Sequence, residues 1–247
     1  MSTSTSTNGP SAAEPLRIGT RGSPLALAQA GMAAAAIGAH HAMGDSALSI
    51  RTFRTTGDRV QDRALAEIGG KALWTRELDR ALLEGEIDIA VHSMKDVETV
   101  MAAGIRLAAV LPRADARDRL IGADSVAALP PGALVGTSSP RREAQLLHRR
   151  PDVRVALLRG NVETRLRRVA EGDFAATFLA AAGLARLGMD AGVAMALDDW
   201  LPAASQGVVG IACREGDTQT MALLAAIDDR ETHMCLNAER AVLAALG

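Results

Sequence analysis

The chain has 247 residues, 48% of them hydrophobic, and a formal net charge of −2. Aromatic residues make up 2% of the chain, which argues against the stacking surfaces of single-stranded nucleic-acid binders, and the near-neutral charge argues against a duplex-DNA binder. Two cysteines without metal-ligand spacing argue against a disulfide scaffold or a metal site and favour a cytoplasmic protein, and no apolar run has the length of a membrane span.

The first half of the chain predicts alternating strands and helices after a polar start. Residues 1–15 lack an apolar run and a basic start, which predicts a disordered tail rather than a signal peptide. Ser23 and Pro24 are typical of a helix beginning, so the alanine-rich run after them predicts a helix over 24–40. The other expected elements are strands at 16–20, 48–55, 87–91 and 105–111, a helix at 74–84 and a long loop at 56–72.

The second half of the chain repeats this alternation. Its expected strands lie at 134–135, 153–158, 174–180 and 208–213, and its expected helices at 140–149, 161–171, 183–187, 217–227 and 231–246. Strands that alternate with helices predict an α/β protein with a mostly parallel sheet. Because two such runs are joined through the charged stretch 112–119, we expect two similar domains that face a cleft.

Arginine is concentrated in one segment of this near-neutral chain. Residues 141–168 contain nine arginines and three acids: Arg141, Arg142, Arg149, Arg150, Arg154, Arg159, Arg165, Arg167 and Arg168, with Glu143, Asp152 and Glu163. Fixed guanidinium groups in such excess indicate a ligand that carries several carboxylates or phosphates. The alternative interpretation is a solvated basic helix face.

Three predicted strands run into turns that carry arginine. The segment 136–142 supplies hydroxyls and a helix N-terminus before its arginines, 158–165 is a second junction of this kind, and Arg21 follows the first strand. Ligands of open α/β sheets bind at the carboxyl ends of strands, so the three junctions together favour an anion site over ordinary capped helices.

Two further loops are candidates for chemistry. Asp96 ends the segment 92–96 after a predicted strand, and next to a lysine it should be a carboxylate that stabilises a cation or moves a proton. A surface ion pair is the alternative. Gly69-Gly70-Lys71 indicates a mobile lid or a plain flexible loop, and His92 and His233 are interpreted as structural or solvated.

Six ordered motifs resemble the hydroxymethylbilane synthases, also called porphobilinogen deaminases. They are RIGTRGSPLALAQA (17–30), GGKALWTRELDRALLEGEIDIAVHSMKD (69–96), VGTSSPRREAQL (135–146), LRGNVETRL (158–166), LAAAGLARLG (179–188) and LPAASQGVVGIACR (201–214). The resemblance implies the head-to-tail joining of four porphobilinogen units with release of ammonia, in tetrapyrrole and haem biosynthesis. The chain grows on a dipyrromethane cofactor held by a cysteine thioether, and each pyrrole carries an acetate and a propionate.

The resemblance also implies roles for individual residues. Asp96 is the implied catalytic carboxylate. The implied cofactor-binding residues are Ser93, Lys95, Thr137, Ser139, Arg141, Arg142 and Arg165, and the implied substrate-binding residues are Arg21, Gln29, Lys71, Arg159, Arg165, Arg186 and Gln206.

The implied fold has two domains like type II periplasmic binding proteins, with mixed, mostly parallel sheets around a cleft. We expect domain 1 at 16–111 and 208–229, domain 2 at 112–207, and at 230–247 the first helix of a truncated third domain. This helix is expected to be mobile, or to pack against domain 1 or against another copy of the chain. The family's attachment cysteine is not present in this chain, because neither Cys213 nor Cys235 lies at its position. The alternative functions are therefore a non-enzymatic clamp for tetrapyrrole carboxylates or another polyanion and, on architecture alone, a solute-binding protein. We expect a monomer that binds a small molecule and no nucleic acid or membrane.

Overall fold

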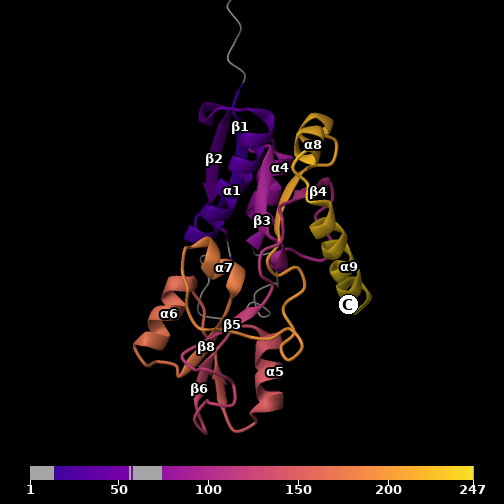
Figure 1. The fold of residues 1–247 in the computed structure, drawn as a ribbon. Helices are drawn as coiled ribbons and strands as arrows, with labels where there is room; N and C mark the ends of the chain where they lie inside the picture. Colours follow the sequence, from indigo (N-terminus) through magenta and orange to yellow (C-terminus); the bar gives the residue numbers. More distant parts are fainter. Residues whose placement is uncertain (1–13, 56, 58–73, 247) are drawn as a thin grey trace, which may run out of the picture.

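The structure, a computed structural model, describes residues 14–55, 57 and 74–246. These residues form two five-stranded sheets, one above the other in Figure 1. The first sheet has the order β2-β1-β3-β10-β4, with β1 at Leu16–Arg21, β2 at Leu48–Phe53, β3 at Ile89–Ser93, β4 at Ile105–Val110 and β10 at Val209–Arg214. The second sheet has the order β7-β6-β8-β5-β9, with β5 at Asp118–Ile121, β6 at Leu134–Gly136, β7 at Arg154–Ala156, β8 at Ala176–Ala180 and β9 at Val193–Ala194.

The two sheets share one topology. In each, three strands with helical crossovers pair in parallel, as β1 does with β2 and β3 and as β6 does with β7 and β8. In each, one further strand, β10 or β5, runs antiparallel to both of its neighbours. The predicted α/β fold with mixed sheets is confirmed, and the antiparallel strand in each sheet adjoins one of the two segments that connect the sheets.

Several helices begin at a residue whose side chain caps them. They are α1 at Pro24–His41, α4 at Arg76–Leu83, α5 at Pro140–Arg149, α6 at Val162–Ala170, α7 at Ala181–Arg186, α8 at Thr218–Ala225 and α9 at Arg230–Leu246, with 3₁₀ turns η1 at Asp45–Ala47 and η3 at Met94–Asp96. Ser23 Oγ accepts a hydrogen bond from Ala26 N (3.3 Å) at α1, and Asn161 Oδ1 accepts one from Thr164 N (2.8 Å) at α6. These bonds satisfy amide groups that have no partner within the helix.

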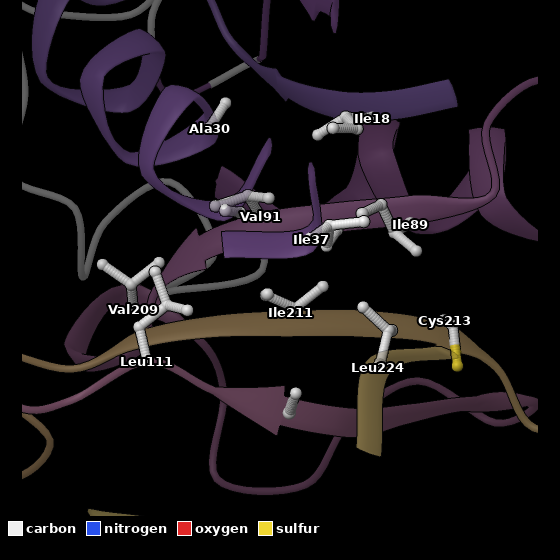
Figure 2. Close-up of a cluster of buried hydrophobic side chains, with 12 residues drawn as sticks. Ile18, Ala30, Ile37, Ile89, Val91, Leu111, Val209, Ile211, Cys213 and Leu224 are labelled. Carbon is white, nitrogen blue, oxygen red and sulfur yellow. The ribbon is translucent and has the colours of Figure 1, made fainter. Parts of the chain in front are cut away.

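Each sheet has its own apolar core. Figure 2 shows the first, in which Ile37 and Ala30 of α1 lie over Ile18, Val91 and Ile211 of the sheet. The second contains the stacked rings of Phe178 and Trp200, whose centroids are 4.7 Å apart, packed with aliphatic residues of β5, β6 and α5. Two separate cores leave the space between the sheets to polar side chains. The domain limits drawn above stay a prediction.

Three features differ from expectation or lie outside the described residues. The stretch 112–119 is not wholly a connection, because Asp118 begins β5 and is buried. Strand β3 continues through His92 and Ser93, which were expected to lie in a turn. Residues 1–13 and Lys71 are not among the described residues. None of the described helices combines the length and apolar character needed to cross a membrane.

Helix α9 is docked on the first sheet. It runs alongside β4 in Figure 1, and Leu236 is fully buried in a cluster with Met94, Val97, Val110 and Val208. Glu239 pairs with Arg113 and also accepts a hydrogen bond from Ser205 N (2.6 Å), so one side chain binds both of the segments that join the two sheets. Of the three expected arrangements of this helix, the structure shows packing on the first sheet.

We predict that Leu236→Ala lowers the free energy of unfolding by about 2–5 kcal/mol, because it leaves a cavity in this cluster. Leu246→Ala on the same helix is the matched control: that side chain is 79% exposed, so its loss should change stability by less than about 0.5 kcal/mol. Urea unfolding of both variants tests the difference, and equal stabilities would contradict the docking of α9.

Candidate functional site

A cavity of about 710 Å³ lies where strand ends of the two sheets meet. Among the described residues, its lining includes seven cationic side chains and a single acid, Glu163. Six of the seven come from predicted site positions, namely Arg21, Lys95, Arg142, Arg159, Arg165 and Arg186; the seventh is Arg54. Such a lining attracts anions, because every strand end that opens into it brings positive charge.

Eight predicted site residues line this cavity. Besides the six cations they are Gln29 on α1 and Ser93 at the end of β3. Asp96, Thr137, Ser139, Arg141 and Gln206 are close in the chain to lining residues but do not line the cavity themselves. Their predicted roles remain predictions.

Arg21 and Arg159 share an aromatic partner. The Arg21 guanidinium carbon lies 4.0 Å from the ring centroid of Trp74, and that of Arg159 lies 5.8 Å from the same ring. Arg159 also donates a hydrogen bond to Gly57 O (3.3 Å). Because Arg21 ends β1 and Arg159 follows β7, the indole holds cations from the two sheets over one surface. The sequence analysis did not single out Trp74.

Arg165 is held by its own turn. Its Nε donates to Gly160 O (2.9 Å), and Gly160 has φ +114, where a Cβ would come within 2.8 Å of Thr164. Burial, with Arg142 and Arg159 nearby, lowers the pKa of Arg165 to about 10, and the carboxylate of Asp96 partly offsets this. The group stays charged at neutral pH, in a place where positive charge is unfavourable without an anion.

Lys95 is affected by burial and by neighbouring charges in the same way as Arg165. Burial lowers the pKa of its ammonium group to about 8; Asp96 and Asp118 raise it, and Arg142 and Arg165 lower it further. The Nζ atom donates to Gln206 Oε1 (3.5 Å). Asp96, at the end of η3, is half-buried and electrostatically close to both Lys95 and Arg165. The carboxylate therefore lies at the margin of the cation cluster.

Asp118 organises the cations on the side of the second sheet. Its carboxylate accepts from Arg142 Nε (3.1 Å) and an Arg142 terminal nitrogen (2.7 Å), and from Arg141 (2.9 Å). Trp200 Nε1 (3.0 Å) and Gln206 Nε2 (2.9 Å) complete the set. Burial alone would raise the pKa of Asp118, but the charge and hydrogen bonds of Arg142, with Arg141 and Gln206, hold it well below its usual range. Sequence reasoning missed Asp118, because it lay in a stretch interpreted as a connection.

The Asp118 network explains where several predicted residues lie. Arg141 points to Asp118 and Leu201 O (2.6 Å), and Gln206 is fully buried between Asp118, Ala116 O and Lys95. Thr137 accepts from Ser139 N (3.1 Å), and Ser139 caps α5 through Arg142 N (3.4 Å). These side chains fix the positions of the lining cations Arg142 and Lys95.

Three buried polar atoms that belong to cavity-lining residues have no hydrogen-bond partner. They are two donors, Gln29 Nε2 and Arg186 Nε, and one acceptor, Glu163 Oε2. Arg186 uses a terminal nitrogen to bind Gly207 O (2.7 Å), and burial lowers its pKa. Buried polar groups are nearly always paired, so the unpaired donors beside the cavity are suited to a ligand that brings hydrogen-bond acceptors.

His92 and His233 do not line the cavity. His92 is buried, its Nε2 is unpaired, and burial next to Arg21 lowers its pKa to about 4, so it is neutral. His233 bonds to Asp228 through Nδ1 (2.9 Å). In the described part of the chain, no three His, Cys, Asp or Glu side chains are grouped to hold a metal ion.

Comparison with known proteins gives consistent matches. Residues 16–222 match the family model described as porphobilinogen deaminase, dipyromethane cofactor binding domain. Porphobilinogen deaminase of Sphingopyxis alaskensis is 60% identical over 94% of this chain and 76% of that protein, and the enzyme of Paracoccus denitrificans is 51% identical over 96% and 77%. The chloroplastic enzyme of Oryza sativa is 48% identical over 94% of this chain and 66% of that protein.

Solved structures agree on the fold. The methionine-binding protein MetQ has a TM-score of 0.53 at 13% identity, over 92% of this chain and 96% of that one. A periplasmic substrate-binding protein of an ABC transporter from Coxiella burnetii has a TM-score of 0.50 at 14% identity, over 91% and 96%. These likenesses support the type II periplasmic-binding-protein fold and nothing about ligands.

We predict that Asp118→Asn lowers the free energy of unfolding by about 3–5 kcal/mol, because it leaves Arg141 and Arg142 buried with an uncompensated charge. Asp115→Asn is the control: it breaks an exposed pair with Arg117, which should contribute less than about 1 kcal/mol. Chemical denaturation at neutral pH measures both variants. A variant at position 118 as stable as the one at 115 would disprove the organising role.

Proposed function

Because this chain belongs to the porphobilinogen deaminase family, we propose that its cationic cavity binds porphobilinogen and the pyrrole chain that grows from it. The chain is a transferase of tetrapyrrole biosynthesis, a hydroxymethylbilane synthase that joins four porphobilinogen units head to tail and releases ammonia. The observation that carries the proposed site is the seven cations and two unpaired donors around one cavity. The comparisons do not favour the alternative of a non-enzymatic clamp.

The side chains present fit the family cofactor. A dipyrromethane with an acetate and a propionate on each pyrrole brings four carboxylates, and it meets cations whose pKa values are lowered where they stand, Lys95 and Arg165. We propose that Ser93, Lys95, Thr137, Ser139, Arg141, Arg142 and Arg165 hold it, Arg142 and Lys95 directly and Thr137, Ser139 and Arg141 by fixing the turn and the Asp118 network. When bound, the group supplies the pyrrole to which the first substrate unit is joined. Cys213, buried in the first core, and Cys235, on α9, do not line the cavity.

The incoming substrate is assigned to the other lining residues. Arg21 and Arg159 over Trp74, with Gln29 and Arg186, present donors to the acetate and propionate. Lys71, outside the described residues, is proposed for the same set on the resemblance alone. Gln206 is assigned an indirect part in substrate binding, because its side chain bonds to Lys95 and Asp118 and so helps to position Lys95. We propose that residues 16–111 with 208–229, and residues 112–207, act as two domains around this ligand.

Asp96 is the proposed catalytic residue. When ammonia leaves porphobilinogen, positive charge develops on the remaining pyrrole, and a carboxylate at the margin of the cation cluster stabilises that charge. Both Lys95 and Arg165 interact favourably with the carboxylate of Asp96. The cation cluster thus neutralises the carboxylates of the growing pyrrole chain, and Asp96 remains as the anion that stabilises the transient cation.

We further propose that the enzyme works as a monomer in the cytoplasm on this small molecule, without nucleic acid or membrane. Its two cysteines are free, and two of its relatives quoted above are bacterial. Analytical ultracentrifugation with and without porphobilinogen tests this proposal: the molecular mass should be that of one chain in both cases.

We predict that Asp96→Asn lowers the rate of ammonia release from porphobilinogen by about 100-fold or more, because the transient cation loses its counter-charge. Glu98→Gln, an exposed acid two residues away, is the matched control and should keep the wild-type rate. Normal turnover of the variant at position 96 would refute the assigned mechanism.

The affinity for the dipyrromethane cofactor, added as a free ligand, should fall as the pH rises through about 8. Lys95 is charged below its lowered pKa and neutral above it, so its attraction for a carboxylate is present at lower pH and lost at higher pH. Calorimetric titrations between about pH 7 and pH 9 should show that the association constant falls by up to about tenfold. Lys95→Arg remains charged over this range, so a variant that shows the same fall would rule out Lys95 as its source.

A further inference from the structure

Among the described residues, Glu163 is the one acid that lines the cavity, and the other charged lining residues are cations. It lies in the first turn of α6, which Asn161 caps. Its Oε2 atom is shielded from solvent and has no hydrogen-bond partner, and Glu163 forms no ion pair among the described residues. An ionised oxygen in this condition is unfavourable unless a ligand or a bound water satisfies it.

The neighbouring cations are committed elsewhere. Arg165, two residues along the helix, donates its Nε to Gly160 O, and its attraction is to Asp96. Arg186 binds Gly207 O, and burial alone lowers its pKa, with no carboxylate opposing that effect. Glu163 is therefore paired with neither of these two arginines.

The unpaired atoms define a ligand of mixed charge. Gln29 Nε2 and Arg186 Nε require acceptors, and Glu163 Oε2 requires a donor. Porphobilinogen offers both: two carboxylates, and one primary amine that is protonated at neutral pH and leaves as ammonia. A ligand with carboxylates alone would satisfy the two donors and repel Glu163.

We propose that Glu163 binds the aminomethyl ammonium group of the incoming porphobilinogen and so selects the monomer. This assignment rests on the proposed function. Each unit that joins the chain has already lost its amine, so the growing chain carries carboxylates but no ammonium group. A carboxylate in the cavity therefore distinguishes the next substrate from units already joined.

The test compares two ligands on three proteins. Calorimetry measures the dissociation constants of porphobilinogen and of an analogue with a methyl group in place of the aminomethyl group, for the wild-type chain, Glu163→Gln and Glu171→Gln. The wild-type chain should prefer porphobilinogen by about tenfold or more, since a charge-assisted hydrogen bond is lost with the analogue. Glu163→Gln should reduce this preference to about onefold. Glu171 pairs with Arg167 on the outer part of the same helix, so its variant should keep the wild-type preference.

The outcomes separate the inference from the proposed function. If Glu163→Gln lowers the affinity for both ligands equally, or leaves both affinities unchanged, the proposed amine contact is wrong while the proposed substrate cavity stands. If the wild-type chain binds neither ligand, the proposed cavity fails and the contact fails with it. A loss of preference in Glu171→Gln as well would assign the effect to the helix rather than to Glu163.

Discussion

The carboxylate of Asp118 is the interaction on which the site depends. It is fully buried, yet it is surrounded by donors from α5 and, through Trp200 and Gln206, from the connection between β9 and β10 that leads back to the first sheet. A buried anion is tolerated only with such partners, and the partners are buried cations that need the anion equally. Through Gln206 the network reaches Lys95, which belongs to the other sheet. One aspartate thus sets the positions of lining cations on both sides of the cavity.

The cavity holds more positive charge than its own acids compensate. The lowered pKa values of Lys95, Arg165 and Arg186 express this imbalance, because each group is less easily protonated here than in water. An enzyme that handles a string of acidic pyrroles benefits from the imbalance: the free energy that favours ligand binding is stored in the folded protein. The carboxylate of Asp96 lies at the margin of this field, where we propose that the transient cation forms.

Sequence patterns predicted the parts of this structure that depend on local chemistry. Ser23 caps a helix as the sequence indicated, and Arg21, Lys95 and Arg159 lie at or just after strand ends that meet at one cavity. What failed depended on contacts distant in the chain. Strand β5 begins with Asp118, and no hydrophobic period marks a strand whose first residue is buried by partners 23 to 88 residues away.

Trp74 and Glu163 were not recognised for a related reason. Trp74 matters because two arginines from different sheets meet over its ring, and Glu163 because its surroundings are cationic without pairing with it. A lone aromatic residue or a first-turn acid has many ordinary explanations in a sequence. Only the assembled cavity distinguishes them.

The two tryptophans have a practical consequence. The chain has two tryptophans and no tyrosine, so its intrinsic fluorescence comes almost entirely from Trp74, in the cavity, and Trp200, bonded to Asp118. Each indole lies beside an arginine, Trp74 beside Arg21 and Trp200 beside Arg149 (5.5 Å). The protein therefore carries its own pair of optical reporters, one sensitive to occupancy of the cavity and the other to the integrity of the second core.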